Sequence, residues 1–192
     1  ALRVAVRALV ALDAATLVRH VQVGPGKPLV GVPGRVMLLN RLGEAMAART
    51  DLFGDGATRP GGLIDALLPQ AKVGRLPAAR ILEALLDGLS AIWPAGLVVD
   101  GVVLGDVGRH GAITVPDRSA GLVPFHKLSQ WLTYSLLEPF EAAGVAVVDL
   151  DELTALPEYR NGGLLVDLEL IVPRQPIDPA QKHPVGSGRL VQ

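Results

Sequence analysis

Apolar residues recur at helical spacing over most of the chain, in segments separated by loops rich in glycine and proline. A segment with three prolines and four glycines, residues 23–34, is expected to be a loop. Residues 97–105 carry valine pairs on either side of Asp100-Gly101, which predicts two short strands joined by a tight turn. The spacing predicts helices over residues 1–20 (with a second short helix over 14–21), 35–50, 64–68, 77–89 and 124–139.

The helix over residues 124–139 is the longest uninterrupted one that the pattern predicts, and Pro139 is expected to end or kink it. Residues 145–150 are consistent with a short strand or a turn. Residues 151–156 predict a short helix begun by Asp149 or Asp151. The proline-rich tail, residues 172–188, is expected to be largely extended. These elements together predict a mainly α fold with a minor β hairpin.

Composition narrows the class of protein further. The 192 residues include 18 Lys and Arg against 19 Asp and Glu, so the net charge is −1. This balance argues against a partner bound mainly by charge, such as nucleic acid or an anionic membrane. Hydrophobic residues make up 49% of the chain, enough to bury a core, and no apolar stretch is long enough to cross a membrane. Without cysteines or a recognisable leader, we expect a cytoplasmic protein.

Two motif classes find no support in the sequence. The glycine-rich segments at 24–31 and 54–62 lack the spacing of phosphate-binding loops and place prolines where backbone donors are needed. The four histidines, at 20, 110, 126 and 183, are too scattered to form a ligand pair. We therefore expect neither a metal nor a cofactor, and the oligomeric state stays open.

Polar and aromatic residues on the helix over 124–139 form the first group with possible chemistry. Lys127, Gln130, Trp131, Tyr134 and Glu138 have the spacing of one helical face. The adjoining face, expected to point toward the core, carries Leu128, Leu132, Ser135 and Leu136. One interpretation is an ordinary amphipathic helix with Lys127 in solvent and Trp131 in the core. The other is a pocket wall, in which an aromatic ring, a cation and an amide orient a polar ligand.

A charged triplet in a turn forms the second group. Glu158, Tyr159 and Arg160 follow a proline and precede Asn161, which the pattern predicts as the N-cap of a helix that starts with two glycines. The backbone N–H groups of such a helix start can bind a phosphate or carboxylate, and a neighbouring carboxylate can be catalytic. The alternative is a structural turn, in which Glu158 pairs with Arg160 or caps the helix.

The strings that contain both groups also carry a resemblance. PFHKLSQWLTYSLLEP (residues 124–139) and LPEYRNGGL (156–164) closely resemble the hallmark strings of the uracil-catabolism protein family of fungi and bacteria, long labelled a domain of unknown function. Further matching strings are RPGG (59–62) and the whole of residues 27–54. The resemblance covers nearly all 192 residues and implies a role in the breakdown of uracil or other pyrimidines.

Two departures from the family pattern affect the site. Family members are longer, so the resemblance implies that residues 1–192 form the C-terminal portion of such a protein, a single and incomplete domain. The family string GDVWRH is GDVGRH in this chain, at residues 105–110. Gly108 therefore stands where relatives have tryptophan. A pocket built from this chain alone is therefore expected to be incomplete.

A more distant similarity bears on mechanism. The order of motifs looks like that of the queuosine-nucleotide N-glycosidase family, a helical fold related to DNA glycosylases, in which an Asp precedes Tyr-Arg. The similarity implies Glu158 as the catalytic carboxylate, one methylene longer than the family's Asp, with Lys127 as its partner. It also implies a set of substrate-binding residues: Phe125, His126, Gln130, Trp131, Tyr134, Tyr159, Arg160 and Asn161.

The implied reaction is hydrolysis of the N-ribosyl bond of a small nucleotide-derived substrate, a ureide of the ribosyl-urea type. A carboxylate near C1′ suits the oxocarbenium-like transition state of such a reaction, and an ammonium group keeps that carboxylate ionised. Two alternatives stay open. The chain can belong to a ring-opening amidohydrolase or deaminase of the same pathway, or to a non-catalytic partner of its cyclohydrolase-like enzyme.

Overall fold

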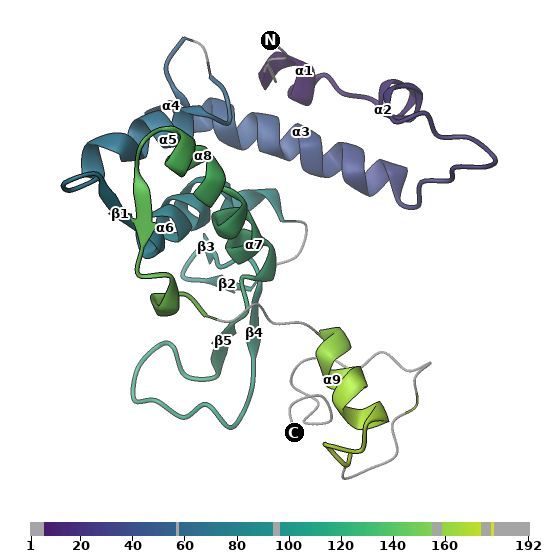
Figure 1. Cartoon of the computed structure of the whole chain (residues 1–192). Helices are drawn as coiled ribbons and strands as arrows, with labels where there is room; N and C mark the ends of the chain where they lie inside the picture. The colour runs from purple at the N-terminus through teal and green to yellow at the C-terminus, as the bar shows by residue number, and fades with distance from the viewer. Residues whose placement is uncertain (1–5, 57, 94–96, 155–158, 174–177, 179–192) are drawn as a thin grey trace. The chain divides into compact units, whose positions relative to one another are not determined.

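The computed structural model describes residues 6–56, 58–93, 97–154, 159–173 and 178, with residues 159–161 described by their backbone only. The chain divides into two compact units. The core unit comprises Ala1–Ala95 and Ser129–Thr154, and the second unit comprises Gly96–Leu128 and Ala155–Gln192. The elements are mostly helices with small two-stranded sheets, which confirms the predicted mainly α class (Figure 1).

Three helices begin the core unit: α1 (Val6–Val10), α2 (Ala14–His20) and α3 (Val32–Ala48), with α1 and α2 lying along α3 (Figure 1). Asp13 caps α2 by accepting the N–H of Thr16 at 2.7 Å, as its position predicts. The Asn40 side chain on α3 donates to three carbonyl oxygens at the end of α1, which fixes α1 against α3. The boundary of the loop predicted over 23–34 is wrong, because α3 already begins at Val32. Pro33 is tolerated in its first turn, where no N–H partner is needed.

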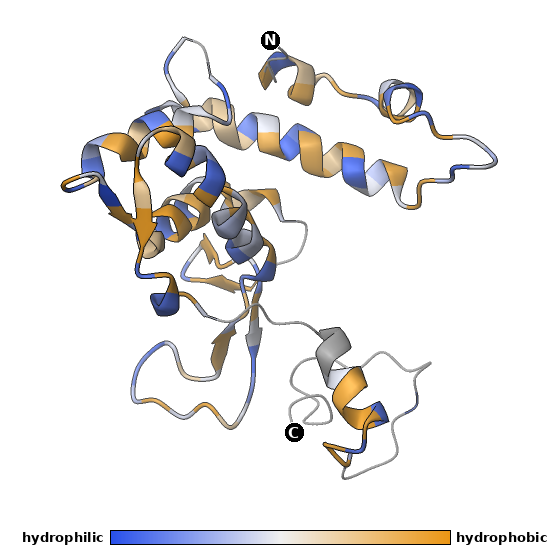
Figure 2. Ribbon diagram, viewed as in Figure 1, coloured by the Kyte–Doolittle hydropathy of each residue, from blue (hydrophilic) through white to orange (hydrophobic). Residues whose placement is uncertain are grey.

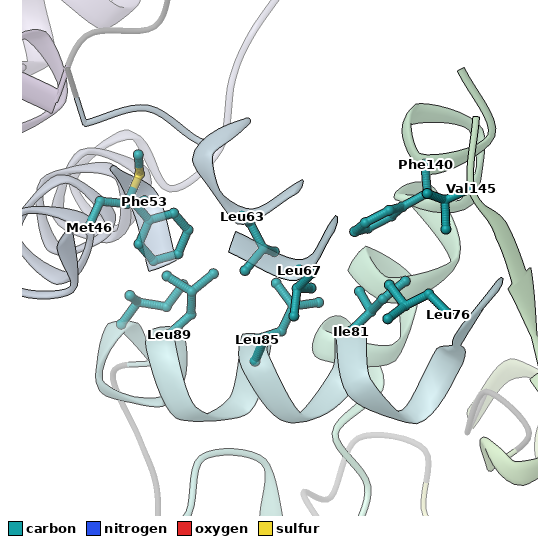
Figure 3. Packing of buried hydrophobic residues seen from close by; sticks show 12 residues of the cluster. Met46, Phe53, Leu63, Leu67, Leu76, Ile81, Leu85, Leu89, Phe140 and Val145 are labelled. Carbon is teal, nitrogen blue, oxygen red and sulfur yellow. The ribbon is translucent and has the colours of Figure 1, made fainter. Parts of the chain in front are cut away.

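Short helices surround α6 and build the core. They are α4 (Thr50–Phe53), α5 (Gly62–Leu67), the 3₁₀ turn η1 (Leu68–Gln70), α6 (Ala78–Leu89) and the 3₁₀ turn η2 (Ser90–Ile92). Pro77 directly precedes α6, close to its predicted place. One side of α6 is buried at helical spacing, by Ile81, Leu85 and Leu89 among others. Figure 3 shows these side chains meeting residues from α3, α4, α5 and α8. The buried cluster consists of Met46, Phe53, Leu63, Leu67, Leu76, Ile81, Ala84, Leu85, Leu89, Ile92, Phe140 and Val145.

Two close approaches within the core unit depend on glycine. A Cβ at Gly43 would lie 2.9 Å from Leu9 Cβ, so the lack of a side chain lets α1 pack directly on α3. A Cβ at Gly62, within the RPGG string, would collide with the backbone of Phe53. The glycines of these strings therefore have a packing role in this fold.

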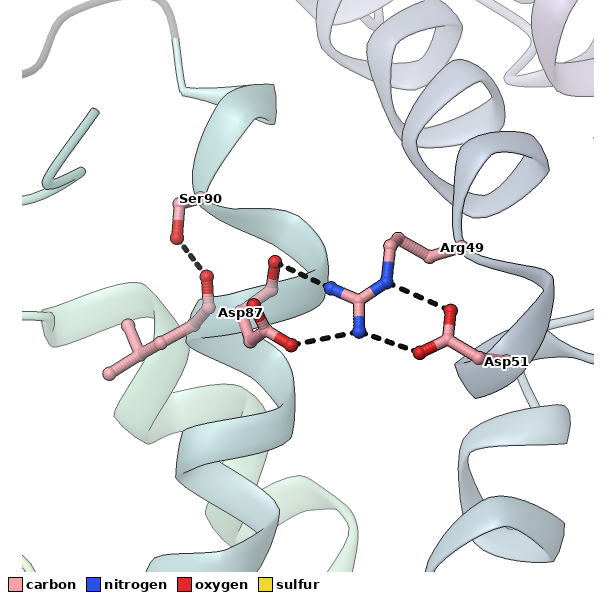
Figure 4. Close-up of polar contacts among 5 residues, drawn as sticks. Arg49, Asp51, Asp87 and Ser90 are labelled. Atoms are coloured by element: carbon pink, nitrogen blue, oxygen red, sulfur yellow. Dashed lines mark hydrogen bonds and ion pairs between the residues drawn. The ribbon is translucent and has the colours of Figure 1, made fainter. Parts of the chain in front are cut away.

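A charged network ties the start of α4 to α6 (Figure 4). The Arg49 guanidinium donates to both carboxylate oxygens of Asp51, at 2.9 and 2.7 Å. It also reaches the main-chain carbonyl oxygen of Asp87 at 3.1 Å and its carboxylate at 2.8 Å. These hydrogen bonds raise the pKa of Arg49 and lower the pKa of the Asp51 carboxyl group. The network is structural and lies at the surface, where such pairs add little stability.

A parallel pair of strands closes the core unit. β1 (Arg75–Pro77) pairs with β6 (Ala146–Val148), which resolves residues 145–150 as a strand in part. β6 follows α8 (Leu137–Ala142), and α8 contributes Phe140 to the core. The short helix predicted over 151–156, begun by Asp149 or Asp151, is found in part, as the single 3₁₀ turn η3 (Leu150–Glu152) after Asp149. Asp149 has a left-handed backbone (φ 57°) and makes no side-chain cap, and residues 155 and 156 lie outside the described residues.

The predicted helix over 124–139 is also corrected, into α7 (Lys127–Ser135) and α8. The break falls four residues before Pro139. Proline has no N–H to donate to the carbonyl of Ser135, and its ring would clash with that carbonyl in a continuous helix. Pro139 instead lies in the first turn of α8, where a missing N–H costs nothing.

Among its described residues, the second unit contains two hairpins and the helix α9 (Tyr159–Asp167). β2 (Val98–Val99) and β3 (Val102–Val103) pair antiparallel around Asp100 and Gly101, both with positive φ, which confirms the predicted hairpin. β4 (Val107–Arg109) pairs antiparallel with β5 (Leu122–Pro124), just before α7. Arg118, from the loop between β4 and β5, donates to Asp100 at 2.9 Å. Most of the predicted extended tail lies outside the described residues.

Candidate functional site

The best-defined part of the candidate site is the segment that enters α7, which contains Phe125, His126 and Lys127. Three consecutive backbone N–H groups there are bound by a single residue, Asp106, from the turn before β4. Its main-chain carbonyl oxygen accepts from the N–H groups of Phe125 and His126, at 3.0 and 3.1 Å. Its carboxylate Oδ2 accepts the N–H of Lys127 at 3.0 Å. Asp106 thus caps α7 from a distance of 21 residues in sequence.

His126, in the segment bound by Asp106, has an unusual backbone conformation. Its φ is 44°, in the left-handed region that a residue with a Cβ rarely adopts. Such strain persists only where surrounding bonds hold it, and here the bonds from Asp106 do so. Burial lowers the pKa of the His126 imidazole, while the negative charge of Asp106 acts in the opposite direction. The ring is therefore mainly neutral near pH 7, when it can accept a proton or a hydrogen bond.

Sequence reasoning missed Asp106. It belongs to the GDVGRH string, whose departure from the family pattern lies two residues later, at Gly108. The only signal available was an acidic residue next to a short strand, which has many uses. Its role as a cap follows from the pairing of β4 with β5, which brings Asp106 to the start of α7.

Replacing Asp106 separates its two roles. The Asp106→Asn variant keeps an oxygen that accepts the Lys127 N–H but loses the charge, so we expect the pKa of His126 to fall further. The Asp106→Ala variant also loses the cap, and we expect the free energy of unfolding to drop by about 1 kcal/mol. An NMR titration of the imidazole, assigned with the His126→Gln variant, measures the pKa, and urea unfolding measures the stability.

The sign of the associated pH dependence is fixed by the direction of the shift. The folded pKa of His126 lies below its unfolded value of about 6.5. The unfolded chain therefore binds more protons as the pH falls below that value, and the histidine lowers stability on acidification. Asp106→Asn should enlarge this acid sensitivity. A His126 pKa that rises or stays constant in that variant would contradict the assigned role of the Asp106 charge.

Lys127, Gln130, Trp131 and Tyr134 lie on α7 with the predicted spacing of one helical face, which runs from a buried to an exposed edge of the helix. Gln130 is buried, Trp131 is exposed and Tyr134 is half-buried. Glu138 lies in α8, past the break, so it is not on this face at all. The predicted core face is wrong for Leu128, Leu132 and Ser135, which are exposed, whereas Leu136 packs against the core as predicted. Ser129, Gln130 and Thr133 are buried instead. Gln130 Nε2 donates to Thr154 Oγ1 and Thr133 Oγ1 donates to the Ser129 carbonyl oxygen within α7, while Gln130 Oε1 has no hydrogen-bond partner among the described residues.

The second predicted group is only partly described. Glu158 lies outside the described residues, as do the side chains of Tyr159, Arg160 and Asn161. The backbone of these three residues forms the first turn of α9, which begins at Tyr159. Asn161 is therefore inside the helix, and its prediction as the N-cap is wrong. The helix start lies two residues earlier, which makes Glu158 the residue directly before α9.

Two hollows formed by the described residues of the core unit are lined by other side chains than these. The larger, a groove of about 480 Å³, is lined by α2 and α3 residues: Ala14, Pro33, Val36, Met37, Asn40, Arg41 and Glu44. Over the described residues, no group of three acidic, histidine or cysteine side chains is arranged to hold a metal ion. Within the same residues, no helix is both long and apolar enough to cross a membrane.

Comparison with known proteins gives three findings. The family model described as "Protein of unknown function (DUF1688)" matches residues 1–186. Uracil catabolism protein 4 of Lachancea kluyveri is 38% identical over 164 residues, which cover 78% of this chain and 36% of the relative. Protein urg3 of Schizosaccharomyces pombe is 36% identical over 188 residues, 97% of this chain and 43% of the relative.

The chain thus spans less than half the length of these curated relatives. No solved structure matches it. The similarity to queuosine-nucleotide N-glycosidases and their glycosylase-like fold therefore stays a prediction.

Proposed function

We propose, since this chain belongs to the DUF1688 family and is similar over most of its length to a uracil catabolism protein, that it acts in uracil catabolism. The single observation that carries this role is the 38% identity to Uracil catabolism protein 4. Protein urg3, at 36% identity, extends the similarity to 97% of the chain. Both alignments cover less than half of the relative, so any activity of the longer proteins is part of the proposal.

The reaction we propose is hydrolysis of an N-ribosyl bond in a ureide derived from a pyrimidine nucleotide. The C1′–N bond breaks, a water oxygen forms the new bond to C1′, and one water proton passes to the departing nitrogen. The products are urea and a pentose or pentose phosphate. Charge builds up at C1′ and the ring oxygen in the transition state, so the protein's task is to place a negative group near C1′.

Glu158 is proposed as that group, with Lys127 as the cation that keeps it ionised. Lys127 is the first residue of α7, and the Asp106 cap fixes its main chain. Lys127 and α9, which Glu158 directly precedes in sequence, belong to the same compact unit. This common membership favours the pairing, because a carboxylate and an ammonium group must share a rigid frame to act on one substrate.

The residues around Lys127 suit recognition of the rest of the substrate. Phe125 offers an apolar ring and His126 a mainly neutral imidazole, both half-buried in the segment held by Asp106. Trp131 and Tyr134 on α7 are proposed to line the ureide site, with Gln130 as an amide contact. Tyr159, Arg160 and Asn161 are proposed to contact the sugar or its phosphate from the first turn of α9.

The decisive experiment is product analysis in water labelled with ¹⁸O. The protein is incubated with N-ribosylurea, its 5′-phosphate and uridine nucleotides, and the products are identified by mass spectrometry. We expect urea without label and a pentose product with one ¹⁸O at C1′. The control is the same incubation with heat-unfolded protein, since ribosyl ureides also hydrolyse slowly in water.

Other outcomes would replace the proposed reaction. An ¹⁸O atom bonded to a carbonyl carbon of the product, with release of ammonia, would identify an amidohydrolase or deaminase. Binding of a ureide without any turnover would identify a non-catalytic member of the pathway. Neither outcome affects family membership.

A further inference from the structure

The exposed face of α7 is more apolar than its buried face. Leu128, Trp131 and Leu132 are 52%, 52% and 39% exposed, whereas Ser129, Gln130 and Thr133 are 7%, 2% and 0% exposed. The three apolar residues have i, i+3, i+4 spacing, so they form one stripe, which we call the α7 stripe. A helix at the surface of a soluble domain normally shows the opposite pattern, with apolar residues inside.

Side chains on the buried side of α7 make hydrogen bonds. Thr133 Oγ1 donates to the carbonyl of Ser129 at 3.0 Å, and Gln130 Nε2 donates to Thr154 Oγ1. Turning the helix to bury the stripe would break the bond between Gln130 and Thr154, whereas the bond from Thr133 to Ser129 lies within α7 and would turn with it. The stripe is therefore the surface that α7 presents outward in this fold.

The described residues of the second unit also expose apolar side chains. The buried hydrophobic side chains of the described residues all belong to the core unit. In the second unit, Val98 and Val102 on the first hairpin are 57% and 60% exposed, and Leu164 and Leu168 at α9 are 54% and 58% exposed. Figure 2 shows α9 in orange over much of its coloured length. Because the described residues of this unit bury no apolar side chain, they gain little to offset their loss of chain entropy, and we expect further apolar surface to cover them.

We propose that the α7 stripe is a docking surface for the part of the family polypeptide that lies outside the region matched here. Both curated relatives carry more than half of their length outside that region. A segment of the same polypeptide loses no translational freedom when it docks, so a short stripe is enough to hold it. This inference does not depend on the proposed reaction.

A second copy of the chain is a poorer occupant on grounds of area. Three half-exposed side chains of these types offer on the order of 300 Å². A specific interface between separate proteins needs roughly 800 Å² from each partner. The stripe is far below that size, which favours an occupant that is already tethered.

The test uses full-length Protein urg3 of Schizosaccharomyces pombe, which aligns with 97% of this chain. A photo-crosslinking amino acid, p-benzoylphenylalanine, is placed at the position aligned with Trp131, and crosslinked peptides are identified by mass spectrometry. The matched control places it at the position aligned with Val30, a loop residue that is 85% exposed. The position aligned with Leu132 serves as a second site if the first variant does not fold.

We expect crosslinks from the Trp131 position, within one polypeptide, to residues outside the matched region, at several times the yield of the Val30 position. Crosslinks to a second copy, crosslinks only within the matched region, or a yield no higher than the control would each overturn the proposal. Because the readout is a contact and not turnover, a failure of the proposed hydrolysis leaves it unaffected.

Discussion

The Glu158→Gln variant is expected to lose at least about 100-fold in turnover of its ribosyl ureide while keeping its fold, the scale of a positioned acid or base. Glutamine matches glutamate in size but carries no charge, so it can neither stabilise positive charge at C1′ nor activate water. The measurement is the rate of pentose release at saturating substrate. Circular dichroism and thermal unfolding show whether the variant is folded.

Two further variants make this test specific. Glu152→Gln removes an exposed carboxylate from η3 and is the matched control, with turnover expected to stay normal. Glu158→Asp keeps the charge and adopts the residue that precedes Tyr-Arg in the N-glycosidase pattern, so it should retain more activity than the glutamine variant. Near-normal turnover of Glu158→Gln would remove Glu158 from the mechanism.

The partnership between Glu158 and Lys127 can be measured in the same assay. If Lys127 acts by keeping the carboxylate ionised, the Lys127→Gln variant loses activity mainly when Glu158 is present. The double variant should then be little worse than Glu158→Gln alone, because residues that act as a unit are not additive. Fully additive losses would indicate that the two side chains serve separate steps.

Phe140→Ala is expected to have the largest effect on stability, a loss of about 3–5 kcal/mol in the free energy of unfolding. The side chain is fully buried, and its ring points into the cluster between α8 and α6 (Figure 3). Alanine would leave a cavity there, and the backbone bond from Val145 N–H to the Phe140 carbonyl limits collapse of the chain into it. Since domains of this size have roughly 5–15 kcal/mol of stability, the variant would be close to unfolding.

Urea unfolding followed by Trp93 fluorescence measures this loss. Trp93 packs against the same cluster, and a Trp131→Phe background makes it the single reporter. Val30→Ala, at a loop residue that is 85% exposed, is the control and should change stability by less than about 0.5 kcal/mol. An equally small change for Phe140→Ala would mean that α8 does not pack on the core as described.

The core could be predicted from sequence to a useful degree because its signals are local. The spacing of Ile81, Leu85 and Leu89 indicates which side of α6 is buried, and Pro77 marks where that helix begins. Asp100-Gly101 specifies its own hairpin, because both residues adopt positive φ at low cost. Pro139 correctly indicated an interruption, although its consequence falls four residues earlier, at the carbonyl that it cannot serve.

The candidate site was harder to predict because its contacts join distant segments. The core face of α7 was predicted from hydrophobicity, and the prediction failed for Leu128 and Leu132, which are exposed. Gln130 is buried instead and donates to Thr154, 24 residues away. The Asp106 cap on Lys127 likewise spans 21 residues. Neither contact leaves a periodic signal, because a hydrogen bond between remote segments constrains only its two ends.

The sequence by itself therefore determined that this chain is mainly helical, where most helices begin, and to which family it belongs, because these properties follow from short-range spacing and from the identity of long strings. Only the tertiary structure decided which side of α7 is buried, what holds His126 in its left-handed backbone, and that the second unit lacks buried apolar side chains among its described residues. Those outcomes depend on which segments meet in space, as where α7 meets Thr154 and the buried Gln130 amide gains a hydrogen-bond partner.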